Sequence, residues 1–310
     1  MERICEFQNY IDCNELKEQY KIQQYELVNL SIGYDELVYL LYSRCIPERV
    51  NGMFVPTKSN SDYKCITLVM DWINNELLGS KMYDLGIQKV NLHFIQPIGN
   101  DFLLLGARAH LYKDGTTDQN AMITDRYGRT IKKFCLGDGI QDCIVTMDKK
   151  IITSYFDEGI FGNYGWDNPL GQNGIVIWDE LGEKIWENTK YDICDCYAIN
   201  IDDQNNLWFY YYSDFHLVKT NFHKDQVYDI NIEGSSAFLI NKKQNELIFD
   251  GGYHNHHFIG YRLDKDIITD KFIFDLTYSS SRLLLKRYTF RSSKAVFMDN
   301  NSRIFCKEFI

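Results

Sequence analysis

The strongest constraint on the fold of this chain is a pattern of four short apolar strands that recurs along its length. Two consecutive units show the pattern most clearly, with strands predicted at Cys196–Asp202, Leu207–Tyr212, His216–Asn221 and Gln226–Ile230, then at Ala237–Asn241, Glu246–Asp250, Phe258–Leu263 and Lys271–Leu276. Units of about 40–50 residues with four strands each are typical of β-propeller blades. One such sheet cannot cover its own faces, so neighbouring units are expected to bury each other.

Five units are complete or nearly so, with first strands near Leu27, Leu92, Cys143, Cys196 and Ala237. A sixth unit begins near Arg287 and stops one strand short. Because an unpaired edge strand is prone to pair with other chains, the N-terminal run Ile4–Tyr10 is predicted to supply the missing strand. Asp12–Gln24 then reads as a short polar helix or loop that leads to the first unit.

These patterns predict an all-β fold, a six-bladed β-propeller with four-stranded antiparallel blades that the N-terminal strand closes. We expect residues 1–310 to form one domain, with residues 1–24 as the closing strand and connecting segment and residues 25–310 as the blades. The alternative is a β-sandwich or barrel of about eight to twelve strands. Strands do not alternate with helices, so an α/β fold is not expected.

Charge, apolar runs and cysteine spacing indicate which classes of partner and site are not expected. The net charge is −10 and no basic stripe is present, so nucleic acid is not expected as a partner. No apolar run approaches the ~20 residues of a membrane helix. The nine cysteines are odd in number and none has zinc-ribbon spacing; Cys194-Asp195-Cys196 lacks the two-residue spacer of redox motifs. We expect a monomer with free thiols in a reducing cytoplasm.

The segment Gly174–Glu187 resembles repeats of the pyrroloquinoline-quinone-dehydrogenase type, which end blades with an Asp-x-x-Gly turn followed by Trp. The matching residues here are Asp179, Gly182 and Trp186. The preceding unit keeps Asp125 and Gly128 but has Lys133 and Phe134 where Trp would fall. The resemblance implies blade packing and does not imply quinone binding.

A second resemblance rests on Ser154–Trp166 (SYFDEGIFGNYGW) together with Tyr211–Val218. These runs are similar to bacterial propeller proteins whose function is uncharacterised. The resemblance implies a propeller fold and brings no activity with it.

Propeller geometry indicates where a binding site should lie. Loops that join the second and third strands of each blade, and links between blades, are expected to open on one face around the central channel. The longest such loop, Phe156–Asn173, holds several glycines and aromatic residues, and long ordered loops often carry function. The predicted ligand-binding residues on these loops are Arg44, Arg108, Glu158, Tyr164, Trp166 and His254.

A metal site is a second hypothesis. Asp142, Asp157, Asp195 and Asp214 occupy equivalent loop positions, and carboxylates suit Ca²⁺ or Mg²⁺. The architecture resembles six-bladed lactonase-type propellers with a divalent ion on the axis, although their Glu and Asn ligand set has no match here. In Tyr253–His257, His254 and His256 alternate as residues that share one side of a strand do; a solvated surface cluster is the alternative.

Three functions stay open. The first is a binding module that holds a protein, peptide or glycan at the channel mouth. The second is a metal-assisted hydrolase or lactonase, and the third is a partner that occludes another protein with an acidic face. Motifs of serine hydrolases, zinc proteases and phosphate-binding loops are absent.

Overall fold

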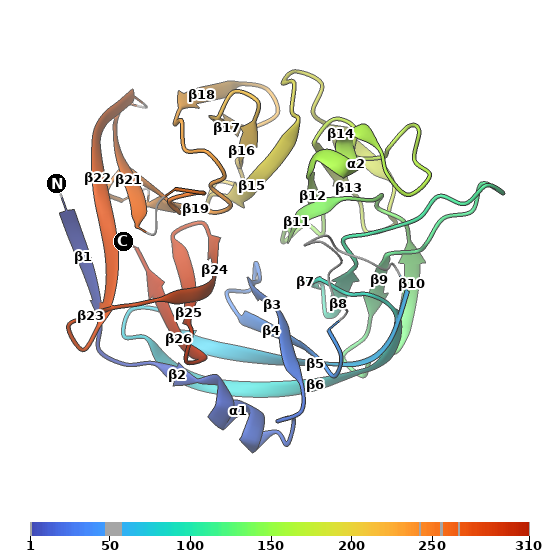
Figure 1. The fold of residues 1–310 in the computed structure, drawn as a ribbon, viewed down its shortest axis with the longest axis horizontal. Coiled ribbons are helices and arrows are strands. Elements are labelled where there is room, and N and C mark those ends of the chain that lie inside the picture. Colours follow the sequence, from blue (N-terminus) through green and yellow to red (C-terminus); the bar gives the residue numbers. More distant parts are fainter. Residues whose placement is uncertain (1, 47–57, 242, 255–256, 266, 310) are drawn as a thin grey trace. The chain divides into compact units, whose positions relative to one another are not determined.

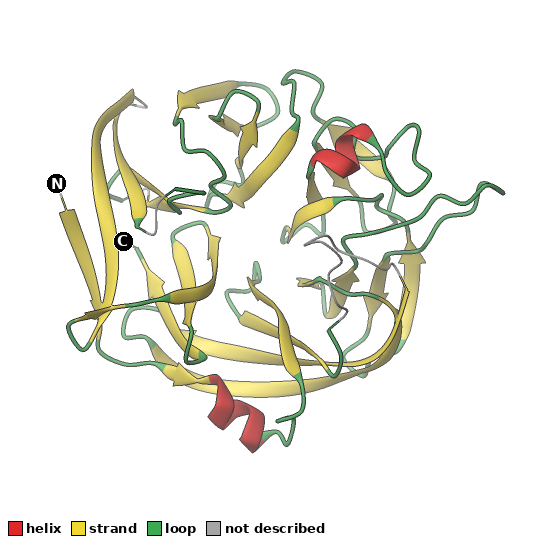
Figure 2. Cartoon of the chain, viewed as in Figure 1, coloured by secondary structure: helices red, strands yellow, loops and turns green. Residues whose placement is uncertain are grey.

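A computed structural model describes residues 2–46, 58–241, 243–254, 257–265 and 267–309. Within these ranges the strands form six sheets, each built mainly from consecutive antiparallel strands; Figures 1 and 2 show the strands. The fold is the predicted six-bladed β-propeller, and helices are confined to two short elements, α1 (Cys13–Gln19) and α2 (Asp157–Phe161).

The first three sheets lie between residues 26 and 187. The first contains β3 (Glu26–Ile32), β4 (Val38–Ser43), β5 (Lys58–Asp71) and β6 (Glu76–Val90). The second contains β7 (Phe94–Ile98), β8 (Asp101–Leu105), β9 (Ala121–Thr124) and β10 (Thr130–Phe134). The third contains β11 (Ile140–Val145), β12 (Ile151–Tyr155), β13 (Ile175–Trp178) and β14 (Lys184–Glu187).

The other three sheets follow. The fourth contains β15 (Asp195–Ile201), β16 (Leu207–Tyr212), β17 (His216–Thr220) and β18 (Asp225–Asp229). The fifth contains β19 (Phe238–Asn241), β20 (Glu246–Phe249), β21 (Phe258–Asp264), β22 (Ile267–Tyr278) and the short β23 (Ser281–Arg282). The sixth contains β24 (Leu285–Arg291), β25 (Lys294–Asp299) and β26 (Arg303–Glu308).

The N-terminal segment completes the sixth sheet, as predicted, but a different strand does so. The two-residue strand β2 (Ile11–Asp12) pairs antiparallel with β26. Most of the predicted closing strand instead forms β1 (Glu2–Phe7), which pairs in parallel with β22 of the fifth sheet. The alternating burial of β1 explains this placement. Cys5 and Phe7 are buried in the hydrophobic cluster that includes Phe274 and Leu276 of β22, whereas Ile4, which points to the opposite side of the strand, stays 65% exposed.

Two tight turns confirm the role expected of the Asp-x-x-Gly sequences. At both, the Gly amide donates to the Asp carbonyl, over 3.0 Å from Gly128 to Asp125 and over 3.1 Å from Gly182 to Asp179. Both glycines have positive φ, 79° and 82°, a conformation that other residues adopt at a steric penalty.

The described residues divide into two compact units. Unit 1 contains residues 1–21, 69–79 and 197–310, and unit 2 contains residues 22–68 and 80–196. Within unit 1, Trp208 and Tyr210 of β16 share one hydrophobic cluster with Phe249 of β20. Within unit 2, Tyr39 of β4 shares another with Phe102 of β8. Within each unit these neighbouring sheets thus bury each other's faces, as blades must; the extent of a single domain over residues 1–310 stays a prediction.

The structure also describes the cysteines and the helices. All nine cysteines are free thiols, and most are buried. No helix in the described part of the chain is long and apolar enough to cross a membrane.

Candidate binding site around Arg108

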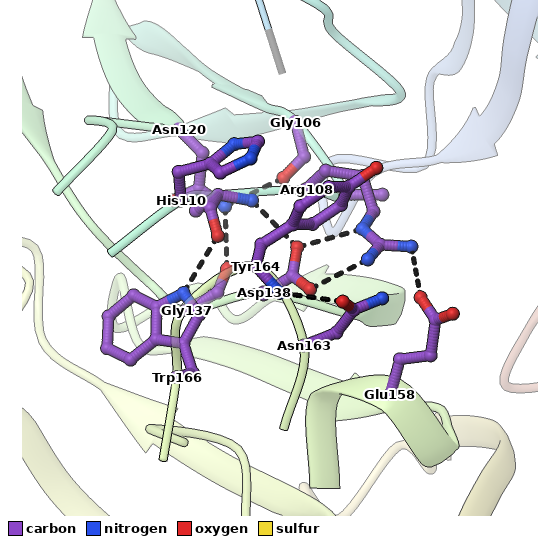
Figure 3. A network of polar contacts seen from close by, with 12 residues as sticks. Gly106, Arg108, His110, Asn120, Gly137, Asp138, Glu158, Asn163, Tyr164 and Trp166 are labelled. Carbon is purple, nitrogen blue, oxygen red and sulfur yellow. Dashed lines mark hydrogen bonds and ion pairs between the residues drawn. The ribbon is translucent and has the colours of Figure 1, made fainter. Parts of the chain in front are cut away.

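Arg108 follows β8 of unit 2 and is the centre of a buried polar network (Figure 3). Its Nε donates to Asp138 Oδ1 over 2.8 Å and its second terminal nitrogen to Asp138 Oδ2 over 2.9 Å, a bidentate pair. The remaining terminal nitrogen lies 2.5 Å from Glu158 Oε2 on α2. The Arg108 side chain is only 3% exposed, Asp138 1% and Glu158 25%. Burial opposes the charged form, but the two carboxylates outweigh it and raise the pKa of Arg108, so the guanidinium stays charged.

The glycines on both sides of Asp138 bring its loop close to α2. Gly137 and Gly139 both have positive φ, 90° and 69°. A Cβ on Gly139 would lie 2.3 Å from the amide nitrogen of Gly159, so only glycine permits this approach. Asp138 also accepts the amide of Ala109 over 2.8 Å. The sequence Gly-Asp-Gly therefore places one carboxylate where it can hold Arg108.

Two further buried side chains hold the surrounding loops. Asn120 donates to the carbonyls of Gly106 and Gly137 over 2.8 and 2.9 Å (Figure 3). The Trp166 indole N–H donates to the carbonyl of Ala109 over 2.8 Å, and its ring is 7% exposed. Trp166 is thus an anchor of the long loop rather than a surface residue.

Tyr164 has a strained backbone in this loop. Its φ is 45°, in the left-handed region that non-glycine residues rarely adopt. Its carbonyl accepts the amide of Leu111 over 3.0 Å. The next residue, Gly165, has no room for a Cβ, which would lie 2.2 Å from the Leu111 carbonyl oxygen. Contacts on both sides therefore hold Tyr164 in a conformation that costs about 1–2 kcal/mol.

The fixed Tyr164 ring belongs to a stacked row of five side chains, Lys58, Tyr112, His110, Tyr164 and Arg108. Cations cover both ends: the Arg108 guanidinium carbon lies 4.3 Å from the Tyr164 ring centroid, and Lys58 Nζ lies 5.0 Å from the Tyr112 centroid. Between them the His110 ring lies 4.1 Å from Tyr164 and 5.7 Å from Tyr112, measured between centroids. His110 and Tyr112 are stacked, with 20° between their planes, whereas His110 and Tyr164 are tilted by 44°. Except for Arg108, the members of the stacked row reach solvent.

Carboxylates lie beside the stacked row and beside α2. At the stacked row, Tyr112 donates its hydroxyl to Asp118 over 2.9 Å. Near Asp157, the first residue of α2, burial raises the pKa of Asp195 to about 7, and the charge of Asp157 adds to the rise. Asp195 Oδ1 is buried without a hydrogen-bond partner in the described part of the chain.

Four of the predicted ligand-binding residues meet in this network, namely Arg108, Glu158, Tyr164 and Trp166. The other two do not belong to it. Arg44 is exposed after β4, where its amide donates to the Asp62 carbonyl. His254 belongs to unit 1, and its Nε2 lies 3.3 Å from Glu233 Oε2.

Three of the four aspartates of the predicted metal site have local hydrogen bonds, and the fourth, Asp195, interacts electrostatically with Asp157. Asp142 and Asp157 accept the amides of their own neighbours Cys143 and Glu158 over 2.7 Å. Asp214 accepts the Tyr211 hydroxyl over 3.2 Å in unit 1. The described residues, which include all four aspartates, contain no group of three or more His, Cys, Asp or Glu side chains that could hold a metal ion. His256, the partner expected for His254, lies outside the described residues.

Sequence reasoning did not select His110, Tyr112 or Asn120, and it placed Asp138 on a link between blades without assigning it to the site. The signal for Asp138 was present in its two flanking glycines. Nothing in the pattern marks His110 and Tyr112, because they lie in the irregular segment between β8 and β9 and become neighbours of Tyr164 only through the amide of Leu111.

Comparisons with known proteins support the fold. Residues 170–307 match the model of the YxzG family. No curated protein matches the sequence. A chain in the crystal structure of the mitotic checkpoint complex is similar with a TM-score of 0.50 and 8% identity, over 91% of this chain and 86% of that chain.

Two bacterial structures are more distant in shape. A catalytically inactive virginiamycin B lyase from Staphylococcus aureus, in complex with quinupristin, has a TM-score of 0.45 and 13% identity over 97% of this chain and 99% of its own. Apo AztD from Citrobacter koseri has a TM-score of 0.43 and 11% identity over 91% and 83%. At these identities the structural likenesses concern the fold alone, and the family match covers less than half of the chain.

Proposed function

We propose that this chain is a binding module that holds a protein or peptide partner on the stacked row. The observation that carries the proposal is the strained Tyr164, whose ring is fixed between Arg108 and His110. Backbone strain of this kind is concentrated at binding and catalytic sites, where surrounding contacts maintain it. A pre-ordered aromatic side chain also loses little entropy on binding, which is why Tyr is common among residues that dominate interface energies.

The charges around the stacked row favour a basic partner segment. Asp118 lies beside Tyr112, Glu158 is partly exposed beside Arg108, and Asp157 is exposed at the start of α2. The whole chain carries a net charge of −10. A partner segment with Lys or Arg would meet a surface rich in negative charge beside the aromatic rings, and complementary charge speeds encounter as well as setting orientation.

Site-specific photocrosslinking tests this proposal. Benzoylphenylalanine is placed at Phe161, which is 68% exposed on α2 in the same loop, and in a control at Tyr127, which is 82% exposed in the turn after β9. We expect a protein adduct from position 161 in cells that make the chain. The adduct should disappear when Tyr164→Ala is added, and position 127 should not give it.

Two outcomes would contradict the proposal. The first is the same adduct from both positions, which would indicate non-specific contact. The second is an adduct at position 161 that Tyr164→Ala leaves unchanged in yield while the variant stays folded by circular dichroism, since the aromatic row would then play no part.

A further inference from the structure

A separate cavity of about 460 Å³ lies wholly within unit 1. It is bordered by the end of β20, the start of β21, the middle of β22 and the segment from β23 into β24. A volume of this size falls in the range of small-molecule sites in proteins. The proposed binding row of unit 2 contributes nothing to its lining.

One wall of the cavity is a linked set of three polar side chains. His257 Nδ1 lies 2.7 and 2.9 Å from the two carboxylate oxygens of Asp275. Arg282 Nε lies 3.2 Å from Asp275 Oδ1, and its Nη1 lies 3.4 Å from His257 Nε2. Asp275 therefore holds both the His257 imidazole and the Arg282 guanidinium in place. Its side chain is only 10% exposed, so little water reaches the carboxylate.

The second carboxylate at the cavity is already satisfied. Asp250 accepts the amide of Ser236 over 2.9 and 3.1 Å and its hydroxyl over 2.7 Å. The Tyr288 hydroxyl donates to the same carboxylate over 2.5 Å. Burial and the Asp250 charge both raise the pKa of Tyr288, so this hydroxyl stays protonated and continues to donate.

Apart from Asn300 and two glycines, the remaining lining is apolar. Phe258, Leu276 and Leu283 line the cavity from the hydrophobic core and are nearly buried, whereas Leu284 is 69% exposed at its border. Such a cavity fits a ligand with an apolar body and one polar end.

We propose that this cavity binds a small organic acid, with its carboxylate at Arg282 and its apolar body against Phe258 and Leu283. Both protein carboxylates at the cavity already accept several donors, so they offer little to a cationic ligand. The guanidinium, 36% exposed, is the permanent cation of the polar wall and matches the planar geometry of a carboxylate. Asp275 and His257 act as positioning residues for it.

The test uses three six-carbon probes that differ only in the polar end: hexanoate, hexanol and hexylamine. Isothermal titration calorimetry with the full chain at low ionic strength measures each dissociation constant. We expect hexanoate to bind at least tenfold more tightly than the other two. Equal binding of hexylamine, or no binding of hexanoate, would overturn the proposal.

Matched variants locate the binding. Arg282→Gln should weaken hexanoate at least tenfold and leave hexanol unchanged, while Arg262→Gln, also in the fifth sheet and 44% exposed, should change neither. His257→Gln should weaken hexanoate by a smaller factor than Arg282→Gln, and His254→Gln on the same loop should not. Tight hexanoate binding that survives Arg282→Gln in a folded protein would show that the carboxylate is held elsewhere.

Discussion

Two arginines in this protein have the same kinds of partner in different surroundings. Arg108 and Arg282 each pair with an aspartate, and each lies beside an aromatic or imidazole ring. Arg108 is 3% exposed and is bound by two carboxylates, whereas Arg282 is 36% exposed at the border of a cavity.

Because of this difference in burial, we expect Arg108 to support the structure and Arg282 to contact a ligand. A buried guanidinium with two carboxylate partners cannot turn toward a ligand without leaving charges unpaired in a medium that solvates them poorly. Arg108 therefore holds Tyr164 and α2 in place, and the stacked row presents the binding surface. Arg282 keeps contact with water and can exchange that water for a ligand group.

The largest expected effect comes from removing the buried arginine. Arg108→Met leaves the buried carboxyl of Asp138, whose pKa burial already raises, without its cation, so the free energy of unfolding should fall by about 3–5 kcal/mol. Arg282→Met removes a partly exposed ion pair and should cost less than about 1 kcal/mol. Urea denaturation followed by tryptophan fluorescence measures both. Equal losses for the two variants would break the distinction drawn from burial.

Asp195 extends the comparison to a buried carboxyl for which the described contacts show no cation. Its pKa is raised from 3.8 to about 7, so the folded state holds the proton between these values while the unfolded state releases it. The protonated Asp195 carboxyl therefore makes its full contribution to the free energy of unfolding below about pH 4. This contribution declines as the pH rises and is lost above about pH 7.

Asp195→Asn tests this pH dependence. The variant should be about 2 kcal/mol more stable than the parent at pH 8, allowing for the part of the side chain that water reaches, and close to it at pH 4. Urea midpoints at the two pH values give the comparison. A gain that is the same at both would mean that the carboxyl ionises normally in the folded state.

A change at Trp166 tests whether its indole is as important for the long loop as the Arg108–Asp138 ion pair. Trp166→Phe keeps an aromatic ring but leaves the buried Ala109 carbonyl without its donor, which should cost about 1–3 kcal/mol. Limited proteolysis should then cut within residues 156–173 faster than in the parent. An unchanged cleavage rate would show that Arg108 and Asn120 hold the loop without the indole.

The smallest expected effect tests the role of backbone strain at Tyr164. Both Tyr164→Ala and Tyr164→Gly remove the ring contacts with Arg108 and His110, but only glycine relieves the left-handed backbone. We expect the glycine variant to be about 1 kcal/mol more stable than the alanine variant, by the same urea assay. The two should be equally poor in partner crosslinking, because the ring is what the partner contacts; restored crosslinking in the glycine variant would argue against that role.

Much of the fold could be predicted because it depends on local patterns. Apolar runs such as Leu207–Tyr212 became strands with the same limits, and the Asp-x-x-Gly sequences became the expected turns. The closing strand was misplaced because Ile4–Tyr10 has the more convincing apolar pattern, while the two-residue pairing of Ile11 is decided by its distant neighbour Ile304.

The candidate site could be predicted only in part. Loop length and composition identified Tyr164 and Trp166, but could not tell an exposed ring from a buried one. The link from His110 to Tyr164, and that from His257 to Arg282, depend on loop geometry that no spacing along the chain encodes. The glycines around Asp138 carried a readable signal, since close backbone approach requires them.

The pairing of β1 with β22 and of β2 with β26 has a consequence for the order of events during synthesis. The ribosome releases the first dozen residues long before their pairing partners exist, whereas every strand of the second and third sheets finds its neighbours within a short stretch of chain. Unit 2 can therefore mature while the nascent chain is still being extended, and unit 1 must wait for its last strand. Contacts between such distant segments form slowly, so the closing of unit 1 should limit the rate at which newly made chains become protease-resistant.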